Sequence, residues 1–266
     1  DGDDLVGMSG FVPCAVIVDG ARRRAAFSTN TLVQPASRRR GIGRLIHEAR
    51  QADYDYALSS GQSAANARLY RRLGYVVAGE YRQFLAQTRL PRIRPRPRVL
   101  RELVSWLRWR VRSRGAEGLT VEIGPGVPDV PDTCYRTRFD DDAVGPIWTR
   151  AHVVWRYERH PYFTHRFATV RRSGVPLGFA VLRHAGGMTA MLDLYAPYGD
   201  QVKVLAALAA HSEEAITGQF VGRALERVFR RAGWTTFRAA NRLMGRSNDP
   251  VLHELLLKRS WCLFGG

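Results

Sequence analysis

The sequence predicts an α/β fold in which helices flank a mixed sheet, with the same unit built twice along the chain. Apolar, β-branched runs alternate with segments whose apolar residues recur at helical spacing. One strand, turn and helix pattern also occurs in both halves. At 266 residues with 45% hydrophobic content, the chain is long enough for two domains that each bury a core.

The first half starts with a predicted hairpin. Residues 11–18 and 25–33 read as strands, and Asp19-Gly20 between them is a tight-turn dipeptide. Pro35 ends the second strand, and a helix follows. Its apolar residues at helical spacing are Ile42, Leu45, Ile46 and Ala49.

The rest of this half alternates in the same way. A short buried strand is expected at 57–58, and Ser63 is a plausible N-cap for a helix that Gly74 ends. Two short strands are then predicted, at 75–77 and 81–85.

Repeated Pro and Arg residues from 90 to 98 forbid a helix and predict an extended connector. A basic amphipathic helix is expected beyond it, either packed between two domains or lying on an anionic membrane through residues 99–113. The predicted organisation is a domain at 1–90, a connector with its helix at 91–118, and a second domain at 119–266.

The second half is expected to begin with loops up to residue 131. A meander of three strands is predicted at the segments 163–171, 175–183 and 188–196. Helices at 202–216 and 221–231 and a strand at 235–239 should follow.

The two halves share a local repeat. The segment from Leu69 to Tyr75 (LYRRLGY) recurs in kind from Val228 to Trp234 (VFRRAGW), each after a strand that ends near a proline and then a helix. The second copy has Phe229 in place of Tyr70 and lacks an arginine and glycine loop. We therefore predict a working first copy, expected to lack its opening helices, and a degenerate second copy.

Charge and cysteines limit the classes of partner. The net charge is +17, but 39 of the 41 basic residues are arginines spread through both halves, so we expect no nucleic-acid partner. The cysteines and histidines show no metal-ligand spacing, so no metal is expected, and three scattered cysteines suit a reducing cytoplasm. No apolar run approaches the roughly 20 residues that span a bilayer.

The strongest chemical motif is R-x-x-G-x-G at the mouth of the first helix. Glycines let the backbone close on phosphates, and the free amides and dipole of a helix N-terminus bind anions. A helix-capping turn is the alternative for this pattern. The residues concerned are Arg38, Arg39, Arg40, Gly41, Ile42, Gly43 and Arg44.

Residues 5–87 resemble the GCN5-related N-acetyltransferase (GNAT) superfamily, through the strand 31–35, the loop Arg38 to Gly43 and the segment Leu69 to Tyr75. The resemblance implies a mixed α/β fold in which two parallel strands splay to admit the pantetheine arm of acetyl-CoA or another acyl-CoA. It implies that Leu32 and Val33 pair with pantetheine and that the Val33 amide stabilises the thioester oxygen.

The same resemblance makes Tyr70 the general acid that protonates the departing thiolate, with a packed aromatic as the alternative. Ser63 stands where the family often has a cofactor-binding asparagine. The family often has a carboxylate before the loop, whereas this strand reads Ser28 to Thr31, so no general base is visible.

The segment from Trp155 to Pro161 looks like one in bacterial tandem GNAT-like proteins, with corner packing or catalysis by His160 as its two interpretations. The acidic run 140–142 is interpreted as a helix N-terminus rather than a metal site.

The sequence thus predicts a bacterial acyl-CoA-dependent N-acyltransferase that acts by direct amine attack on a small-molecule, sugar or protein acceptor. Its second unit would close the acceptor cleft or mediate homodimerisation. The alternative is a non-catalytic acyl-CoA-binding or membrane- or partner-tethering module.

Overall fold

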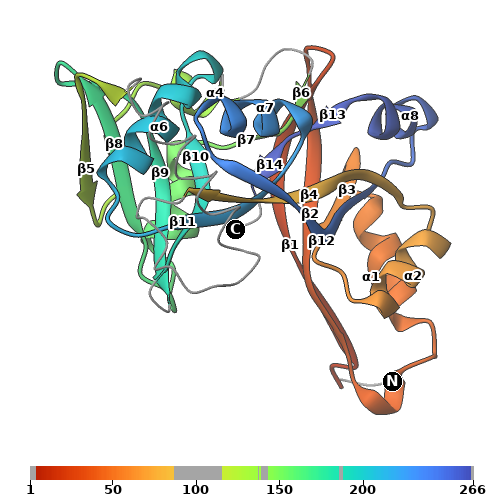
Figure 1. Ribbon diagram of the computed structural model, residues 1–266. Helices are drawn as coiled ribbons and strands as arrows, with labels where there is room; N and C mark the ends of the chain where they lie inside the picture. Colours follow the sequence, from red (N-terminus) through yellow and green to blue (C-terminus); the bar gives the residue numbers. More distant parts are fainter. Residues whose placement is uncertain (1–3, 87–115, 137, 139–142, 186–187, 265–266) are drawn as a thin grey trace, which may run out of the picture. The chain divides into compact units, whose positions relative to one another are not determined.

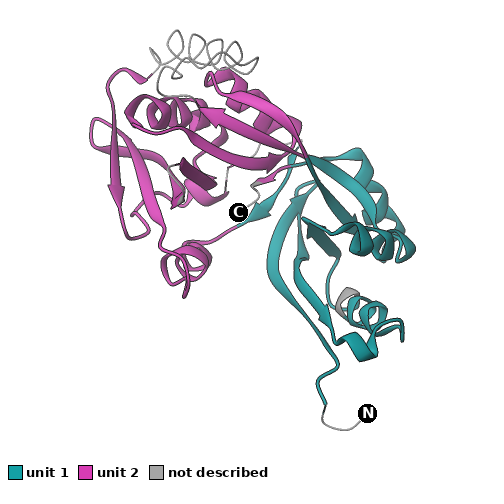
Figure 2. Cartoon of the chain, turned by 60° about the horizontal axis from the view of Figure 1, so that its bottom comes forward, with its two compact units in different colours: residues 1–80, 142–147, 240–261 teal, residues 81–141, 148–239, 262–266 magenta. Residues whose placement is uncertain are grey.

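The computed structural model describes residues 4–86, 116–136, 138, 143–185 and 188–264 (Figure 1). These form two compact units, each assembled from separate stretches of sequence (Figure 2). Unit 1 comprises residues 1–80, 142–147 and 240–261, and unit 2 comprises 81–141, 148–239 and 262–266. The predicted connector, the amphipathic helix at 99–113 and the acidic run at 140–142 lie outside the described residues.

Unit 1 begins with the predicted hairpin. Strand β1 (Gly7–Val18) pairs antiparallel with β2 (Ala21–Val33). The turn residues Asp19 and Gly20 both have positive φ, 50° and 74°, which Gly adopts without steric cost and Asp tolerates. The turn dipeptide therefore fixes the hairpin register that the alternating strands require.

The strand, turn and helix pattern of unit 1 is confirmed. After β2, a 3-10 turn η1 (Pro35–Ser37) leads to helix α1 (Ile42–Gln51). Strand β3 (Tyr56–Ser60) then pairs parallel with β2, and helix α2 (Ala64–Arg72) follows. Ser63 caps α2 by accepting a hydrogen bond from the Asn66 amide, and Gly74 ends it with a φ of 80°.

One continuous strand replaces the two short strands predicted after α2. Strand β4 (Val76–Ala86) runs through Gly79 and Glu80, which interrupt the apolar pattern without ending the strand. Its residues Tyr81–Ala86 form an antiparallel ladder with β11 (Ile216–Val221), and this ladder keeps the strand extended.

Unit 2 contains the predicted meander. Strands β8 (Arg166–Arg172), β9 (Val175–Ala185) and β10 (Met188–Tyr195) pair antiparallel in order. The loop expected up to residue 131 is partly wrong, because Leu119–Gly124 forms strand β5 against β8. Its pattern of Leu119, Val121 and Ile123 alternating with polar residues is a short period-2 signal.

Short elements precede and follow the meander. Before it lie helix α4 (Thr133–Arg136), the strands β6 (Ala143–Val144) and β7 (Pro146–Ile147), and helix α5 (Arg150–Val153), which runs on as a π-helical turn η3 (Val154–Glu158). After it, a 3-10 turn η4 (Tyr198–Asp200) leads into helix α6 (Gln201–His211), which is followed by β11.

The helix predicted at 202–216 is too long. Helix α6 ends at His211, since Ser212 Oγ donates to the Glu214 carbonyl in a local turn, and Ile216 already belongs to β11. Helix α7 (Arg223–Arg231) confirms the next helix, and strand β12 (Thr235–Arg246) extends beyond the predicted residue 239. Helix α8 (Pro250–Lys258) and strands β13 (Ser260–Trp261) and β14 (Leu263–Phe264) were not predicted.

Two strands pass from one unit into the other along the chain. Strand β4 starts in unit 1, and its residues 81–86 pair with β11 in unit 2. Strand β12 starts in unit 2, and its residues 243–246 pair antiparallel with β3 in unit 1. Each unit is therefore completed by a strand end that the other half of the sequence supplies.

The repeated segments adopt the same local geometry. In the first, the Tyr75 amide donates to the Tyr70 carbonyl at 2.9 Å across Gly74. In the second, the Trp234 amide donates to the Phe229 carbonyl at 3.0 Å across Gly233, whose φ is 88°. Both helices thus end in the same left-handed glycine cap.

Candidate functional site

The loop between β2 and α1 is shaped by two left-handed residues. Arg39 has a φ of 65° and Gly41 a φ of 84°, which turn the backbone sharply after η1. Arg38 anchors the loop, because its Nε donates a hydrogen bond to the Val33 carbonyl at 3.2 Å. The loop thus returns onto the end of the strand from which it came.

The first turn of α1 offers amides to a ligand. The bond that opens the helix joins the Leu45 amide to the Gly41 carbonyl at 3.1 Å. The preceding amides, those of Ile42, Gly43 and Arg44, have no acceptor within the helix. Arg38, Arg39, Arg40 and Arg44 are exposed around them, so an anion would meet both amides and guanidinium groups.

Strand β2 extends past its parallel partner. The ladder between β2 and β3 ends at the pair Ser28 and Ser59, whereas β2 continues to Val33. The Gln34 amide donates to the Val6 carbonyl, on the β1 side of the strand. Because successive amides of a strand point to opposite edges, the Val33 N–H points to the edge that β3 leaves open.

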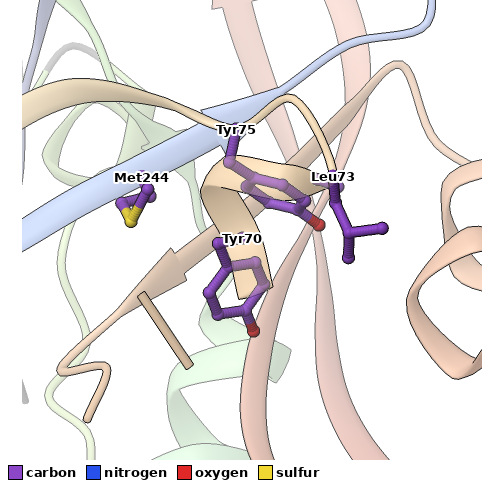
Figure 3. Close-up of a cluster of buried hydrophobic side chains, with 5 residues drawn as sticks. Tyr70, Leu73, Tyr75 and Met244 are labelled. Atoms are coloured by element: carbon purple, nitrogen blue, oxygen red, sulfur yellow. The ribbon is translucent and has the colours of Figure 1, made fainter. Parts of the chain in front are cut away.

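Tyr70 lies in a buried cluster of unit 1 (Figure 3). It is 2% exposed, and its ring centroid lies 4.9 Å from that of His47 and 4.6 Å from that of Tyr75. Leu73 and Met244 belong to the same cluster. The packing that was the alternative interpretation of Tyr70 is therefore present, and its role as a proton donor stays a prediction.

The remaining site residues are placed as follows. A side-chain carbon on Gly43 would lie 3.5 Å from Leu69, the neighbour of Tyr70 on α2, so the first turn of α1 faces that helix. Ser63 Oγ is engaged in capping α2. Leu32 is 61% exposed at the end of β2.

A pocket in unit 1 contains one predicted cofactor residue, Arg44. Its volume is about 820 Å³, and its lining also includes Arg72, Arg246 and His253. Glu48 is the carboxylate in the lining, and it pairs with Arg44 at 2.9 Å. Sequence reasoning missed Arg246 and His253, because β12 and α8 bring them to unit 1 from a distant part of the chain.

In unit 2, side chains of the unit itself close the start of the helix that follows η4. Turn η4 passes directly into α6, without a four-residue loop like 38–41. Gln201, at the start of α6, is fully buried and donates to the carbonyls of Arg138 and Ala196. Lys203 Nζ lies 2.6 Å from Asp200 Oδ1. This helix end therefore offers no counterpart to the loop of unit 1.

The described residues limit other kinds of site. Among them, no three His, Cys, Asp or Glu side chains gather in a way that could hold a metal ion. None of the helices in this part of the chain has the length and apolar content needed to cross a membrane.

Comparison with solved structures supports the fold. The chain is similar to a GCN5-related N-acetyltransferase from Kribbella flavida (16% identity, TM-score 0.60, 96% of this chain and 60% of that one). It is also similar to a GCN5-related N-acetyltransferase from Anabaena variabilis (14% identity, TM-score 0.59, 97% of this chain and 72% of that one). A third similar structure is Eis1 from Mycobacterium abscessus (17% identity, TM-score 0.57, 94% of this chain and 63% of that one). The chain thus spans less than two thirds of the length of the Kribbella protein and of Eis1.

Sequence comparison is more local. No curated protein matches the chain. The family model described as an acetyltransferase (GNAT) domain matches residues 1–78, which contain β1 to α2 and the loop 38–41. Residues 1–78 thus match a GNAT domain, and the mixed α/β fold of the chain is similar to that of structures described as GCN5-related N-acetyltransferases.

Proposed function

We propose that the protein is an acyl-CoA-dependent N-acyltransferase, in which unit 1 binds the acyl-CoA and an acetyl or similar acyl group passes to a primary amine by direct attack. The observation that supports this most is the adjacency of an open strand edge at Val33 and an amide-lined, arginine-rich loop at 38–41. A thioester arm and a diphosphate need these two features next to each other.

The residues of the loop fit a diphosphate. Among the described residues other than its two chain neighbours, none has an atom within 4 Å of where a side-chain carbon on Gly41 would lie, so the space beside its backbone is open. The amides of Ile42, Gly43 and Arg44 and the guanidinium groups of Arg38 to Arg40 would hold the phosphates. An acyl-CoA, once bound, supplies an activated thioester.

The residues at the end of β2 would serve the reacting group. The Val33 N–H is fixed in the strand and points to its open edge, so it would stabilise negative charge on the acyl oxygen as the amine attacks. Leu32 and Val33 would pair with the pantetheine arm. Tyr70, on the helix that faces the first turn of α1, would give its phenolic proton to the departing thiolate.

Unit 2 is proposed to be a degenerate copy of the same unit. It repeats the 3-10 turn, the helix and the left-handed glycine cap, but Phe229 replaces Tyr70 and Gln201 blocks the helix end. No disulfide joins Cys14, Cys134 and Cys262 in the described part of the chain, in keeping with action in a reducing cytoplasm.

A binding module without catalysis is the second candidate. The observation that favours it is the strand before the loop, which offers Ser28 to Thr31 and no carboxylate to deprotonate the amine. The first test is isothermal titration of the full chain with acetyl-CoA, followed by a thiol-release assay with a panel of small amines, amino sugars and peptides. Micromolar binding with thiol release supports the enzyme, whereas binding without release for any acceptor supports the module. Absence of binding at millimolar acetyl-CoA contradicts both.

A further inference from the structure

A second pocket lies wholly in unit 2, and none of its lining residues belongs to the proposed acyl-CoA site. It has a volume of about 570 Å³, within the range of small-ligand sites. Its walls come from η3, the residues that follow it up to His165, and the strands β9 and β10. Apart from Glu158, the segment from Trp155 to Pro161 that the sequence analysis singled out lines the pocket.

The pocket is strongly positive. Three guanidinium groups line it, those of Arg156, Arg159 and Arg183, and no carboxylate occurs among the described residues of its lining. The nearby acids are already engaged. Asp193 forms a buried ion pair with Arg138 and accepts a hydrogen bond from the Tyr195 hydroxyl at 2.7 Å.

Glu158, the acid next to Arg159 in sequence, is also engaged, since it accepts a hydrogen bond from the Val127 amide at 2.7 Å. Neither carboxylate is among the described residues that line the pocket. An excess of fixed positive charge in a concave site favours an anionic ligand.

Two imidazoles in the lining are held in opposite tautomers. The amides of Tyr162 and Phe163 both donate to His160 Nδ1 at 3.2 Å, so this nitrogen carries no proton and Nε2–H is the remaining donor. His165 Nδ1 lies 2.9 Å from the Tyr157 carbonyl, which only accepts, so Nδ1 is the donor and Nε2 is bare. Burial lowers the pKa of His165, which keeps this ring neutral at pH 7.

Exposed aromatic side chains form the apolar part of the pocket. Trp155 is 58% exposed and Phe163 is 51% exposed, although both are large apolar residues. The Arg183 guanidinium lies 4.8 Å from the centroid of the Phe163 ring, so a cation and an aromatic face stand together. Exposed aromatic rings in a concave site are typical of ligand recognition.

We propose that this pocket binds an organic anion with a planar, apolar body. The carboxylate or phosphate group would be held by Arg159, Arg183 and the Nε2–H of His160, and the planar body would lie against Trp155 and Phe163. The inference is independent of the acyl-CoA site, because every residue in it belongs to unit 2.

The test is isothermal titration of the full chain, without acyl-CoA, with benzoate and with phenyl phosphate. Two comparison ligands lack one feature each: benzamide has no charge, and inorganic phosphate has no ring. We expect one or both aryl anions to bind at least about tenfold more tightly than benzamide and inorganic phosphate. The better of benzoate and phenyl phosphate identifies the anionic group.

Variants locate the binding. Arg183→Gln should weaken binding of the aryl anion by about tenfold. Phe163→Ala should also weaken binding of the aryl anion, while the weak binding of inorganic phosphate stays unchanged. Arg172→Gln is the matched control, because it removes the same charge at an exposed position of β8 outside the pocket. The proposal would be overturned if benzamide or inorganic phosphate bound as tightly as the aryl anions. An equal loss of aryl-anion affinity in Arg183→Gln and Arg172→Gln would overturn it as well.

Discussion

The guanidinium of Arg38 donates a hydrogen bond to the carbonyl oxygen of Val33, and the Nε to oxygen distance is 3.2 Å. This bond joins the loop proposed to hold a diphosphate to the strand end proposed to stabilise the acyl oxygen. Because the N–H and C=O of a strand residue point to the same edge, Arg38 lies beside the edge at which the Val33 amide is free of β3. The two halves of the proposed site are therefore fixed relative to each other within unit 1.

Gly41→Ala should weaken acetyl-CoA binding by about tenfold, because a side chain at positive φ shifts the loop backbone at a cost of about 1–2 kcal/mol. Gly174→Ala is the matched control. Its φ is 82°, against 84° for Gly41, and both positions have open space for the added carbon. Titration calorimetry should show loss of affinity for Gly41→Ala alone, and equal affinities in the two variants would contradict the loop assignment.

Tyr70→Phe should lower kcat by about 100-fold or more while leaving acetyl-CoA affinity unchanged, because a general acid acts in the chemical step. The fold should tolerate the change, since the buried Phe229 precedes a glycine cap of the same geometry in the second repeated segment. Tyr75→Phe is the control, a buried phenol in the same cluster with its ring 4.6 Å away. If both variants kept full activity in a thiol-release assay, the role of Tyr70 as general acid would be contradicted, and Tyr70 would serve only in packing.

The sequence predicted features that depend on neighbouring residues. The turn at Asp19-Gly20, the Ser63 cap and the stop at Gly74 are each set by one or two residues and their own backbone angles. The repeat was recognisable for the same reason, because a glycine cap after a helix is a local signal.

Features that depend on distant segments could not be predicted. The passage of β4 into unit 2 and of β12 into unit 1 is decided by strand pairing across more than a hundred residues, which no local pattern encodes. The placement of Arg246 in a pocket with Arg44 follows from that passage. The buried pair of Arg138 and Asp193 likewise joins segments 55 residues apart.

His152→Phe should reduce the pH dependence of stability between pH 6.5 and about 4. Burial foremost, and then the Arg156 charge, lower the His152 pKa from 6.5 to about 4, while Asp193 opposes the shift. In this window the unfolded chain binds a proton that the folded chain does not, so stability is lost as the pH falls.

The replacement keeps an aromatic ring stacked on Trp148, whose centroid lies 3.9 Å away, and removes the titrating group. Urea unfolding at several pH values should show that the variant loses less stability on acidification. The slope of its unfolding free energy against pH should be smaller, by the equivalent of up to about one proton per molecule. The remaining slope includes His165, whose pKa is also lowered by burial. An unchanged slope would contradict the assignment.

Asp193→Asn should be among the most destabilising single substitutions in unit 2. Arg138 is 1% exposed, its Nε donates to the Leu194 carbonyl at 2.8 Å, and its guanidinium lies 4.2 Å from the centroid of the Tyr195 ring. Removing the negative charge of Asp193 leaves this buried cation without its counter-ion, which typically costs about 3–5 kcal/mol.

The exposed pair of Arg136 and Asp132 is the internal control for this prediction. Its atoms are 3.4 Å apart and its side chains are 72% and 78% exposed, so Asp132→Asn should change stability by less than about 1 kcal/mol. Replacing both buried partners, as Arg138→Met with Asp193→Leu, should cost less than Asp193→Asn alone, because no unpaired charge then stays in the core. Urea denaturation measures the stability of all three variants. A change in stability shifts the midpoint and leaves the slope of unfolding free energy against urea concentration unchanged. Equal midpoints for Asp193→Asn and Asp132→Asn would mean that water reaches Arg138 in the variant, and they would contradict the prediction.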